Sequence, residues 1–285
     1  MKNPSERNAN GGRVKKLDGR ELAGFIKERQ AAEVRSIMGQ GGVDSLGRMP
    51  KLLIIRNSDS PVITKYVGLK MQYGSDIGVD VVDYYTDSIM GIKAQILKAN
   101  EDPSISGIIV QLPLSDVTKT DEVLALISPS KDVDGLTGKR SKFDSATATA
   151  ILWLLTGYDI SLAKPAKIAL VGRGRLVGGP LIRMFTDSGY DFDVFGRDGD
   201  LSKLNQYDII ITATGQPHLI SDSMIKPGAV VVDAGTASED GVLVGDLDDA
   251  VRERDDLRAI TPRVGGVGPL TVSVLFDNVI RAAKG

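Results

Sequence analysis

The stretch KIALVGRGRLVGGP (167–180) decides the fold of this chain. It begins with a continuous apolar run of the kind found in strands buried on both faces of a parallel sheet. The glycines after that run would let the backbone approach a pyrophosphate, which binds against the N–H groups that open the next helix. Gly172 and Gly174 match the usual fingerprint, but Val177 occupies its third glycine position and Gly178 comes one residue late. The stretch is therefore compatible with a dinucleotide site or with a tight strand–helix turn.

The rest of the second half repeats the pattern of strand and turn. A helix is expected around 178–188, and strands are predicted at DFDVFG (191–196), YDIIITAT (207–214) and AVVVDAG (229–235). Short strands between glycine- and proline-containing turns predict an open, doubly wound sheet. A second glycine-bearing turn, ATGQPH (213–218), follows one of these strands, and such sheets bind ligands at the carboxyl ends of neighbouring strands. The two turns together favour the dinucleotide site.

The first half alternates strands with helices. Ser60 followed by Pro61 places serine at an N-cap and proline at the first helical position, which predicts a helix over about 61–75. Strands are predicted at KLLIIRN (51–57), VDVVDYY (79–85) and GIIVQ (107–111), with further helices near 18–37, 89–97 and 120–127. This β-α-β-α-β order favours a parallel sheet with helical crossovers.

The length of 285 residues and these patterns predict an α/β protein of two lobes. An α/β substrate domain is expected over 13–145, completed by a C-terminal helix at 270–285 that begins near Pro269. A Rossmann-like, doubly wound nucleotide-binding domain is expected over 146–269, entered through the apolar helix ATATAILWLL (146–155).

Composition excludes several classes of function. The net charge is −2, so the basic footprint of a nucleic-acid binder is absent and no nucleic-acid partner is expected. There is no cysteine and a single histidine, His218, so disulfides, a cysteine nucleophile and thiolate or histidine-cluster metal sites are not expected. The segment MKNPSERNANGGRVK (1–15) has no apolar core of a secretory signal, and no stretch is long and apolar enough for a membrane helix. We expect a disordered leader, no membrane association and a cytoplasmic protein.

The strand after the glycine turn ends in Gly196-Arg197-Asp198, where the adenosine ribose of a dinucleotide would lie. An acidic group there would accept hydrogen bonds from the ribose hydroxyls of NAD, whereas an arginine would pair with the 2′-phosphate of NADP. Arg197, together with Arg173 of the glycine turn, favours NADP as the cofactor, with NAD as the alternative. Both arginines are also compatible with ordinary solvated loop residues.

Polar groups of the first half are candidates for chemistry. Tyr66 and Lys70 stand four residues apart on the predicted helix and so share a face. A partly buried lysine beside a phenol has a lowered pKa and can transfer protons at neutral pH, although such pairs are also common on helix surfaces. Gln111 lies just past a strand end, where a polar group is placed to face a ligand. The carboxylates of KDVDG (131–135) are compatible with a ligand site or with a simple Asx-turn cluster.

Taken together, these segments resemble the methylenetetrahydrofolate dehydrogenase/cyclohydrolase family of bifunctional folate enzymes. The matching segments are KLDGRELA (16–23), Tyr66-Val67 with Lys70, GIIVQLPL (107–114), KDVDGL (131–136), IALVGRGRLVGGP (168–180), MIKPGAVVVDAG (224–235), GDLD (245–248) and ITPRVGGVGPLT (260–271). The combination of QLPL, DVDG and GGVGP-x-T in this order and spacing is highly specific. The resemblance implies two reactions on tetrahydrofolate derivatives. One oxidises 5,10-methylenetetrahydrofolate to the methenyl compound with NAD(P)+, and the other hydrolyses that compound to 10-formyltetrahydrofolate.

The resemblance also implies roles for individual residues. The lysine matching Lys70 is the proton-transfer residue of the hydrolytic step, Gln111 hydrogen-bonds it, Tyr66 stacks on the folate ring system and Asp134 binds the pterin edge. Further folate contacts are implied at Leu112, Pro113, Gly265, Gly266 and Pro269. Dinucleotide contacts are implied at Gly172, Arg173, Gly174, Val177, Arg197, Thr214, Gly215, Thr147 and Thr271. A homodimer and a place in purine biosynthesis are implied as well.

Several positions depart from the family pattern. Ile63 stands where a serine usually comes three residues before the tyrosine, and RNSDSP (56–61) lacks the glycine that opens that loop. Residues 145–150 keep only the threonine of the usual P-C-T-P-x-G, Arg263 and the next valine replace Val-Pro, and Gly174 replaces the serine of the G-R-S phosphate loop. These departures keep one alternative open, a single-activity or non-catalytic relative that binds folate or nucleotide. A short-chain oxidoreductase is disfavoured, because in that class the Tyr-x-x-x-Lys pair follows the nucleotide motif, whereas here it precedes it.

Overall fold

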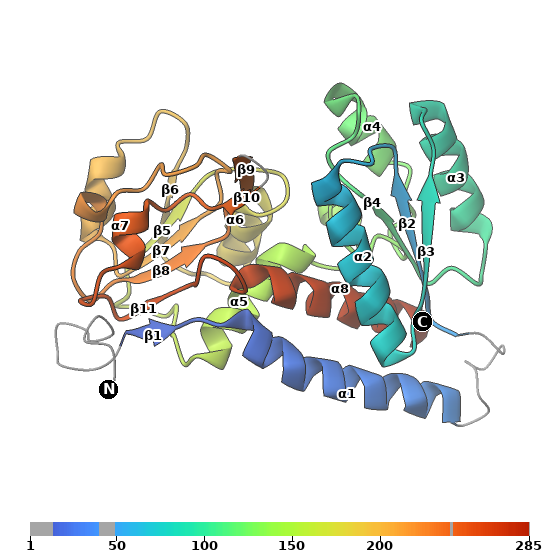
Figure 1. Ribbon diagram of the computed structural model, residues 1–285, viewed down its shortest axis with the longest axis horizontal. Coiled ribbons are helices and arrows are strands. Elements are labelled where there is room, and N and C mark those ends of the chain that lie inside the picture. Colours follow the sequence, from blue (N-terminus) through green and yellow to red (C-terminus); the bar gives the residue numbers. More distant parts are fainter. Residues whose placement is uncertain (1–13, 40–48, 240–241, 285) are drawn as a thin grey trace. The chain divides into compact units, whose positions relative to one another are not determined.

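The computed structural model describes residues 14–39, 49–239 and 242–284, and the elements of this part are labelled in Figure 1. The chain divides into two compact units. The six-stranded unit consists of Met1–Leu22 and Thr147–Thr271, and the three-stranded unit of Ala23–Ala146 and Val272–Gly285. The expected leader at residues 1–13 lies outside the described residues.

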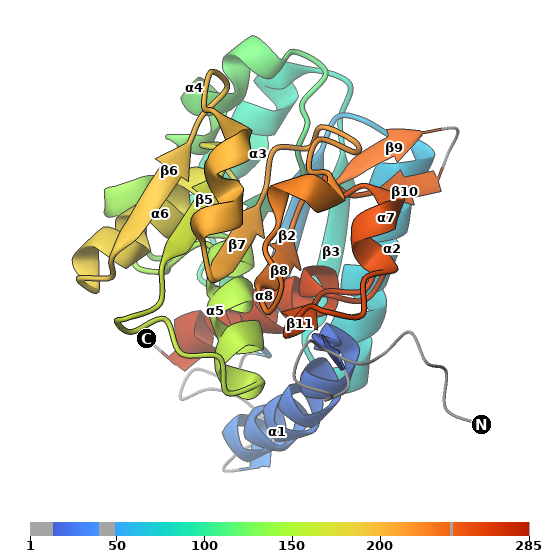
Figure 2. The same cartoon turned by 90° about the vertical axis from the view of Figure 1, so that its left-hand side faces the viewer.

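The six-stranded unit contains a parallel sheet in the order β1-β11-β8-β7-β5-β6, whose central strands lie side by side in Figure 2. The strands are β1 (Lys15–Lys16), β5 (Ile168–Val171), β6 (Phe192–Phe195), β7 (Ile209–Thr212), β8 (Val230–Asp233) and β11 (Ala259–Ile260). From β5 the chain adds β6 on one side and then crosses to add β7, β8 and β11 on the other, while the earlier strand β1 pairs with β11 at the edge. This reversal makes the sheet doubly wound, as predicted, and ligands of such sheets bind where the strand order reverses.

Alternate residues of these strands enter cores on the two faces of the sheet. Ala169, Val171, Ile210 and Val231 share one buried cluster with apolar residues of the connections, including Leu204. The connections are α6 (Gly178–Asp187), η4 (Leu201–Gln206), η5 (Asp222–Met224) and α7 (Asp249–Arg252). A separate antiparallel pair, β9 (Ala237–Glu239) and β10 (Val242–Val244), interrupts the path from β8 to α7.

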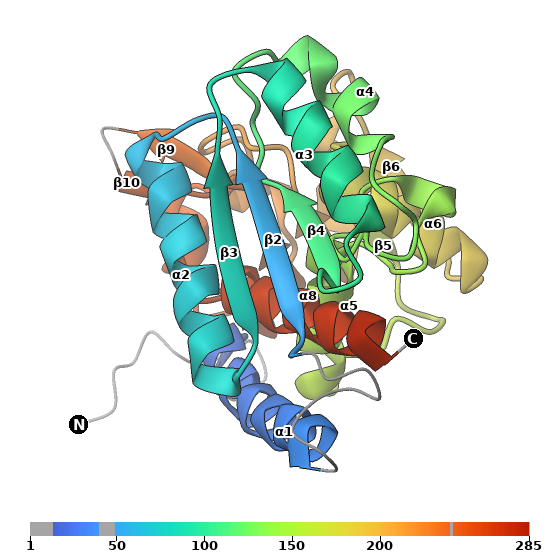
Figure 3. The same ribbon diagram turned by 90° about the vertical axis from the view of Figure 1, so that its right-hand side faces the viewer.

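The three-stranded unit contains a second parallel sheet, in the order β3-β2-β4 (Figure 3). Its strands are β2 (Lys51–Arg56), β3 (Asp80–Tyr85) and β4 (Gly107–Val110), and its helices include α2 (Pro61–Ile77), α3 (Ile89–Glu101), η2 (Val117–Lys119), α4 (Thr120–Leu124) and η3 (Gly138–Arg140). Leu53 and Ile55 of β2 share a buried cluster with Ile92 and Ile96 of α3. The predicted β-α-β-α-β order is confirmed.

The two ends of helix α2 are set by capping residues. The Ser60 hydroxyl accepts a hydrogen bond from the Ile63 N–H at 3.3 Å, and Pro61 occupies the first turn. The helix ends at Gly78, whose φ of +83° is left-handed and favours glycine. The helix expected over about 61–75 is therefore present, with one further half-turn.

Helices α1 (Gly19–Gly39), α5 (Ala146–Gly157) and α8 (Val267–Lys284) each have residues in both units. From Val272 onward, α8 belongs to the three-stranded unit. The Gln30 side-chain amide of α1 donates to the Ser273 carbonyl at 2.8 Å and accepts from the Tyr73 hydroxyl of α2 at 2.8 Å. The Tyr73 and Phe276 rings also stack with centroids 5.0 Å apart. These contacts explain why α8, the last helix, packs with α1 and α2 in the three-stranded unit.

The segment that precedes α1 pairs with a strand from the second half of the chain. Lys15 and Lys16 pair with Ala259 and Ile260, so the segment preceding α1 forms the edge strand of the six-stranded sheet. A two-residue strand carries no period that a sequence can display, which is why β1 and β11 were not predicted. Within the described residues, no helix is both long and apolar enough to cross a bilayer.

Ile96 and Leu97 of α3 offer a matched test of this core. Ile96 is fully buried, whereas Leu97 is 53% exposed on the same helix. We expect Ile96→Ala to lower the free energy of unfolding by about 2–5 kcal/mol, because it removes apolar contacts and leaves a cavity. Leu97→Ala should change it by less than about 0.5 kcal/mol. Urea unfolding followed by circular dichroism measures both, and equal losses would contradict the assigned core.

Candidate active site

Lys70 and Gln111 form the central contact of the three-stranded unit. Tyr66 and Lys70 lie one turn apart on α2, and Gln111 follows the last residue of β4. The Lys70 ammonium donates to Gln111 Oε1 at 2.6 Å, and Gln111 Nε2 donates to the Leu112 carbonyl at 3.1 Å. The Gln111 N–H donates to the Ile55 carbonyl at 2.8 Å, which continues the β2–β4 ladder. The backbone thereby fixes the residue, and its amide presents the oxygen to the lysine.

The surroundings of Lys70 change its protonation equilibrium. Burial lowers the pKa of Lys70, and the negative charge of Asp134 opposes that shift. Burial also raises the pKa of the half-buried Tyr66, so its phenol stays protonated near neutral pH. A lysine with a lowered pKa beside a neutral phenol and an amide is suited to proton transfer.

Asp134 is held by the turn that contains it. The preceding carboxylate, Asp132, is buried and accepts hydrogen bonds from the Thr137 N–H at 2.9 Å and the Thr137 hydroxyl at 2.7 Å. The Ala146 N–H donates to the Asp134 carbonyl at 3.2 Å. Burial raises the pKa of Asp134 to about 6; the positive charge of Lys70 opposes the rise, and the Asp132 charge adds to it. The two carboxylates of DVDG therefore differ in what they do. Asp132 holds the turn through hydrogen bonds, whereas Asp134 interacts electrostatically with Lys70.

Asn57 is a buried polar residue that the sequence did not single out. It follows β2, and its amide makes a reciprocal pair with Ser115: Nδ2 donates to the Ser115 hydroxyl at 2.6 Å, and Oδ1 accepts from the Ser115 N–H at 3.1 Å. Asn57 thus joins the loop that leads into α2 to the Gln111–Ser115 loop. Leu112, which is half-buried, and Pro113, which is exposed, lie within that second loop, and the peptide bond between them is cis.

The glycine turn after β5 is closely packed. A Cβ on Gly172 would lie 2.6 Å from the Ala213 carbonyl oxygen, and one on Gly178 would lie 2.3 Å from the Gly172 carbonyl oxygen. Gly172 also has a φ of +105°, a region that favours glycine. Gly174 is exposed, and Val177 is buried and precedes the first residue of α6. The turn therefore fits a dinucleotide: its backbone is open toward solvent at Gly174, and α6 begins directly behind it.

Arginines lie on the loops that follow β5 and β6. Arg173, Arg175 and Arg197 are all exposed. A Cβ on Gly196 would lie 3.5 Å from Arg173 Nε, so the Arg173 side chain extends over the carboxyl end of β6. Arg197 follows Gly196 directly. The structure thus brings the two predicted 2′-phosphate residues, Arg173 and Arg197, to neighbouring strand ends.

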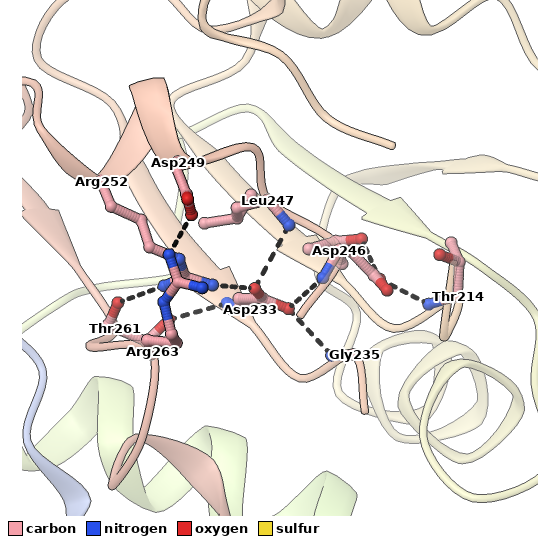
Figure 4. Close-up of polar contacts among 10 residues, drawn as sticks. Thr214, Asp233, Gly235, Asp246, Leu247, Asp249, Arg252, Thr261 and Arg263 are labelled. Carbon is pink, nitrogen blue, oxygen red and sulfur yellow. Dashed lines mark hydrogen bonds and ion pairs between the residues drawn. The ribbon is translucent and has the colours of Figure 1, made fainter. Parts of the chain in front are cut away.

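The second glycine-bearing turn follows β7. The Thr214 N–H donates to Asp246 Oδ2 at 2.7 Å (Figure 4). The Thr214 hydroxyl accepts from the Gln216 N–H at 3.1 Å. Gly215 is exposed and has a φ of +67°. His218 is exposed and also has a left-handed φ of +55°. The turn is ordered by hydrogen bonds on its inner side and open on its outer side.

The GGVGP segment packs against the segment KLDGR. The Gly19 N–H donates to the Gly265 carbonyl at 2.8 Å, and a Cβ on Gly19 would lie 1.9 Å from the Gly266 carbonyl oxygen. Gly265 has a φ of +94°. Pro269 and Thr271 are half-buried in the first turns of α8, where the Thr271 hydroxyl donates to the Val267 carbonyl at 3.3 Å. Thr147, the second residue of α5, is half-buried.

Some departures from the family pattern have a structural account. Ile63 is 4% exposed, so this side chain fills the core under α2. Ala148 and Ala150 are fully buried in α5, where small side chains pack closely. The Arg263 guanidinium pairs with the Asp249 carboxylate of α7.

One α/β unit carries a half-buried lysine–amide pair, and the other carries a doubly wound sheet with a glycine turn. These features are those of a two-domain enzyme that binds a nucleotide. The model of the tetrahydrofolate dehydrogenase/cyclohydrolase catalytic domain matches residues 17–134, and the model of the NAD(P)-binding domain of the same family matches residues 145–285. The chain belongs to the tetrahydrofolate dehydrogenase/cyclohydrolase family.

Individual proteins agree with this membership. The chain is 35% identical to the bifunctional protein FolD of Halothermothrix orenii, over 94% of this chain and 97% of that protein. It is 33% identical to the FolD of Lactobacillus acidophilus, over 94% and 96%. The bifunctional FolD of Campylobacter jejuni superposes with a TM-score of 0.85 at 31% identity, covering 95% of this chain and 99% of that one. A Trypanosoma brucei FolD complexed with NADP and an inhibitor gives a TM-score of 0.85 at 27% identity, covering 95% and 97%.

The protein is therefore a methylenetetrahydrofolate dehydrogenase and methenyltetrahydrofolate cyclohydrolase that uses a nicotinamide dinucleotide. Of the predicted site residues, Tyr66, Lys70, Gln111, Leu112, Pro113 and Asp134 lie in the three-stranded unit, and all the others lie in the six-stranded unit. Asn57 and Asp246 were missed as residues that hold the site, whereas Asp132 was considered as one of the KDVDG carboxylates. Their common signal is a polar side chain next to a strand end or in a turn.

Asp134→Asn tests the electrostatics of the site. The carboxyl has a pKa of about 6 in the folded protein and of about 3.9 in an unfolded chain, so the folded state binds more protons between these values. The free energy of unfolding of the wild type therefore falls as pH rises from about 4 to about 6, because the proton that the folded state binds more tightly is lost. Asparagine does not titrate, so the stability of Asp134→Asn relative to wild type should increase over that window and then level off. Urea unfolding at several pH values measures the difference; a flat difference would contradict the raised pKa.

Proposed function

We propose that Lys70 accepts the proton in the hydrolytic step and that Gln111 keeps it in place. The observation that carries the proposal is the 2.6 Å hydrogen bond from Lys70 Nζ to Gln111 Oε1. An amide oxygen accepts a hydrogen bond from an ammonium group and also, more weakly, from a neutral amine. The contact therefore survives loss of the proton and keeps the amine aimed in one direction.

The charge of the substrate supports the same role. The methenyl compound is a cation, and a second positive charge nearby is disfavoured, so the substrate adds to the effect of burial on the pKa of Lys70. Water adds through its oxygen to the methenyl carbon, and a proton of that water passes to the Lys70 amine. The bond from this carbon to N5 then breaks as the hydroxyl proton is transferred to N5. The formyl group stays on N10, and one proton is released in all.

Two further side chains would bind the folate. Tyr66 lies one turn before Lys70, and its phenol ring offers a face on which the folate ring system stacks. Asp134 would accept hydrogen bonds from the N–H groups at the pterin edge. Leu112, Pro113, Gly265, Gly266 and Pro269 complete the proposed folate contacts.

The dehydrogenase step needs the pterin to be aligned with the nicotinamide ring more than it needs an acid or a base. The bound dinucleotide supplies the hydride acceptor. The proposed contacts of this chain with it are Gly172, Arg173, Gly174, Val177, Arg197, Thr214, Gly215, Thr147 and Thr271. Their role is to bind the phosphates and riboses and to hold the nicotinamide in one orientation.

We further infer that NADP is the preferred dinucleotide. Arg173 and Arg197 lie at neighbouring strand ends, and two guanidinium groups offer the 2′-phosphate charge-assisted hydrogen bonds that NAD could not use. We also infer a cytoplasmic homodimer that supplies formyl groups for purine biosynthesis. Both inferences rest on the family resemblance.

Lys70→Met tests the proton-transfer role. Methionine keeps the length and apolar stem of lysine but has no amine, so we expect hydrolysis of the methenyl compound to fall by more than about a hundredfold. Lys65→Met, at an exposed position of the same helix, is the matched control and should retain activity. Hydrolysis is followed by loss of methenyl absorbance. Unchanged hydrolysis in Lys70→Met would refute the assigned role.

A coupled assay tests the cofactor preference. With 5,10-methylenetetrahydrofolate as substrate, we expect a higher kcat/KM with NADP+ than with NAD+. Arg173→Ala and Arg197→Ala should each raise the KM for NADP+ by about tenfold, because each removes a hydrogen bond to a charged group, and should barely alter the KM for NAD+. Equal effects on the two dinucleotides would rule out the 2′-phosphate assignment.

A further inference from the structure

We propose that Asp246 is a positioning residue for the dinucleotide: its carboxylate fixes the Thr214 turn and, through that turn, the glycine turn at Gly172. The inference rests on the proposed dinucleotide contacts of those two turns. Asp246 itself is fully buried, so it acts through the backbone of these turns and not by direct contact with the dinucleotide.

One oxygen of Asp246 holds the turn after β7. Oδ2 accepts from the Thr212 hydroxyl at 2.6 Å and from the Thr214 N–H at 2.7 Å. Thr212 is the last residue of β7 and is fully buried. Both donors are therefore held by a single buried acceptor, and the direction in which the chain leaves the strand is determined by it.

The turn after β7 in turn shapes the glycine turn. The residue between the two donors is Ala213, whose carbonyl oxygen would lie 2.6 Å from a Cβ on Gly172. The Ala213 N–H also donates to the Val171 carbonyl at 2.9 Å. Backbone in such close contact cannot move independently. A shift of the Thr214 turn therefore displaces the glycine turn.

A second carboxylate holds the backbone of Asp246, as Figure 4 shows. Asp233, at the end of β8, accepts at Oδ1 from the Asp246 N–H at 3.1 Å and from the Gly235 N–H at 3.0 Å. The Arg252 guanidinium of α7 pairs with Asp233 and donates to the Thr261 carbonyl at 3.2 Å. The ends of β7, β8 and β11 are thereby tied into one polar cluster.

The two oxygens of Asp246 have different surroundings. A Cβ on Gly235 would lie 2.0 Å from Oδ1, so this oxygen packs against the glycine backbone. Among the side chains that the structure describes, Oδ1 is a buried atom with no hydrogen-bond partner. Only Oδ2 orders the turn, so an asparagine whose oxygen takes that place retains the positioning function.

The test compares Asp246→Ala with Asp246→Asn in the intact protein. The alanine variant leaves the Thr212 and Thr214 donors without their acceptor. We expect it to raise the KM and the dissociation constant for both NADP+ and NAD+ by about tenfold or more. Asp246→Asn keeps the acceptor and should restore both quantities to within about threefold of wild type. Calorimetric titration gives the dissociation constants, and the coupled assay gives the KM.

The cyclohydrolase reaction consumes no dinucleotide and serves as the internal control. We expect Asp246→Ala to keep the cyclohydrolase kcat and KM within about twofold of wild type. Asp255→Ala, at an exposed position of the same unit, is the matched control for removing an aspartate. Equal loss of both activities, unchanged dinucleotide binding in Asp246→Ala, or failure of Asp246→Asn to restore binding would each overturn the proposal.

The two arginine variants separate this inference from the proposed cofactor contacts. Arg173→Ala and Arg197→Ala are expected to weaken NADP+ alone, whereas Asp246→Ala acts on the shared backbone and weakens both dinucleotides. If the arginine variants bind NADP+ normally while Asp246→Ala does not, the 2′-phosphate assignment is wrong and the positioning role stands. If the reverse holds, the positioning role is wrong.

Discussion

Polar side chains at the carboxyl ends of parallel strands hold the loops that follow, and the candidate site residues depend on them. In a parallel sheet the strand ends meet at one edge, and the backbone there leaves the ladder with unpaired N–H groups. In the three-stranded unit, Asn57 after β2 is bonded to Ser115, and Gln111 after β4 continues the ladder before it reaches Lys70. In the six-stranded unit, Asp246, which accepts from Thr212 and Thr214, and Asp233 serve the same purpose. The same physical need is met by an amide in one sheet and by carboxylates in the other.

The protonation of the site follows from the opposite effects of burial on the pKa of a lysine and of an aspartate. Removing water disfavours the charged form of every group, so the pKa of Lys70 falls while the pKa of Asp134 rises to about 6. Each group also stabilises the charged form of the other, which keeps both shifts smaller than burial alone would make them. The proposed proton acceptor and the proposed folate-binding carboxylate can thus operate at one pH in one unit. The other unit, which matches the NAD(P)-binding domain of the family, has close backbone turns and exposed arginines instead.

Much of the architecture could be predicted because it depends on local patterns in the sequence. The apolar run before Gly172, the Ser60-Pro61 start of α2 and the strand–helix alternation depend on near neighbours, and the structure confirms each of them. The short strands β1 and β11 could not be predicted, because two residues show no period and their pairing joins Lys15 to Ala259 across most of the chain. Asn57 and Asp246 were missed for a related reason: a polar residue near a turn is ordinary until its buried partner is known.

The sequence by itself determined the fold class, the family and the identity of Tyr66, Lys70, Gln111 and Asp134 as the candidate folate-site residues. These follow from spacing along the chain and from motif order, which are properties of the sequence. Only the tertiary structure decided that Lys70 meets Gln111 41 positions away, at 2.6 Å, and that Asp246 meets Thr214 32 positions away, at 2.7 Å. The energies of these contacts depend on burial and on distances between remote residues, and the packed fold sets both.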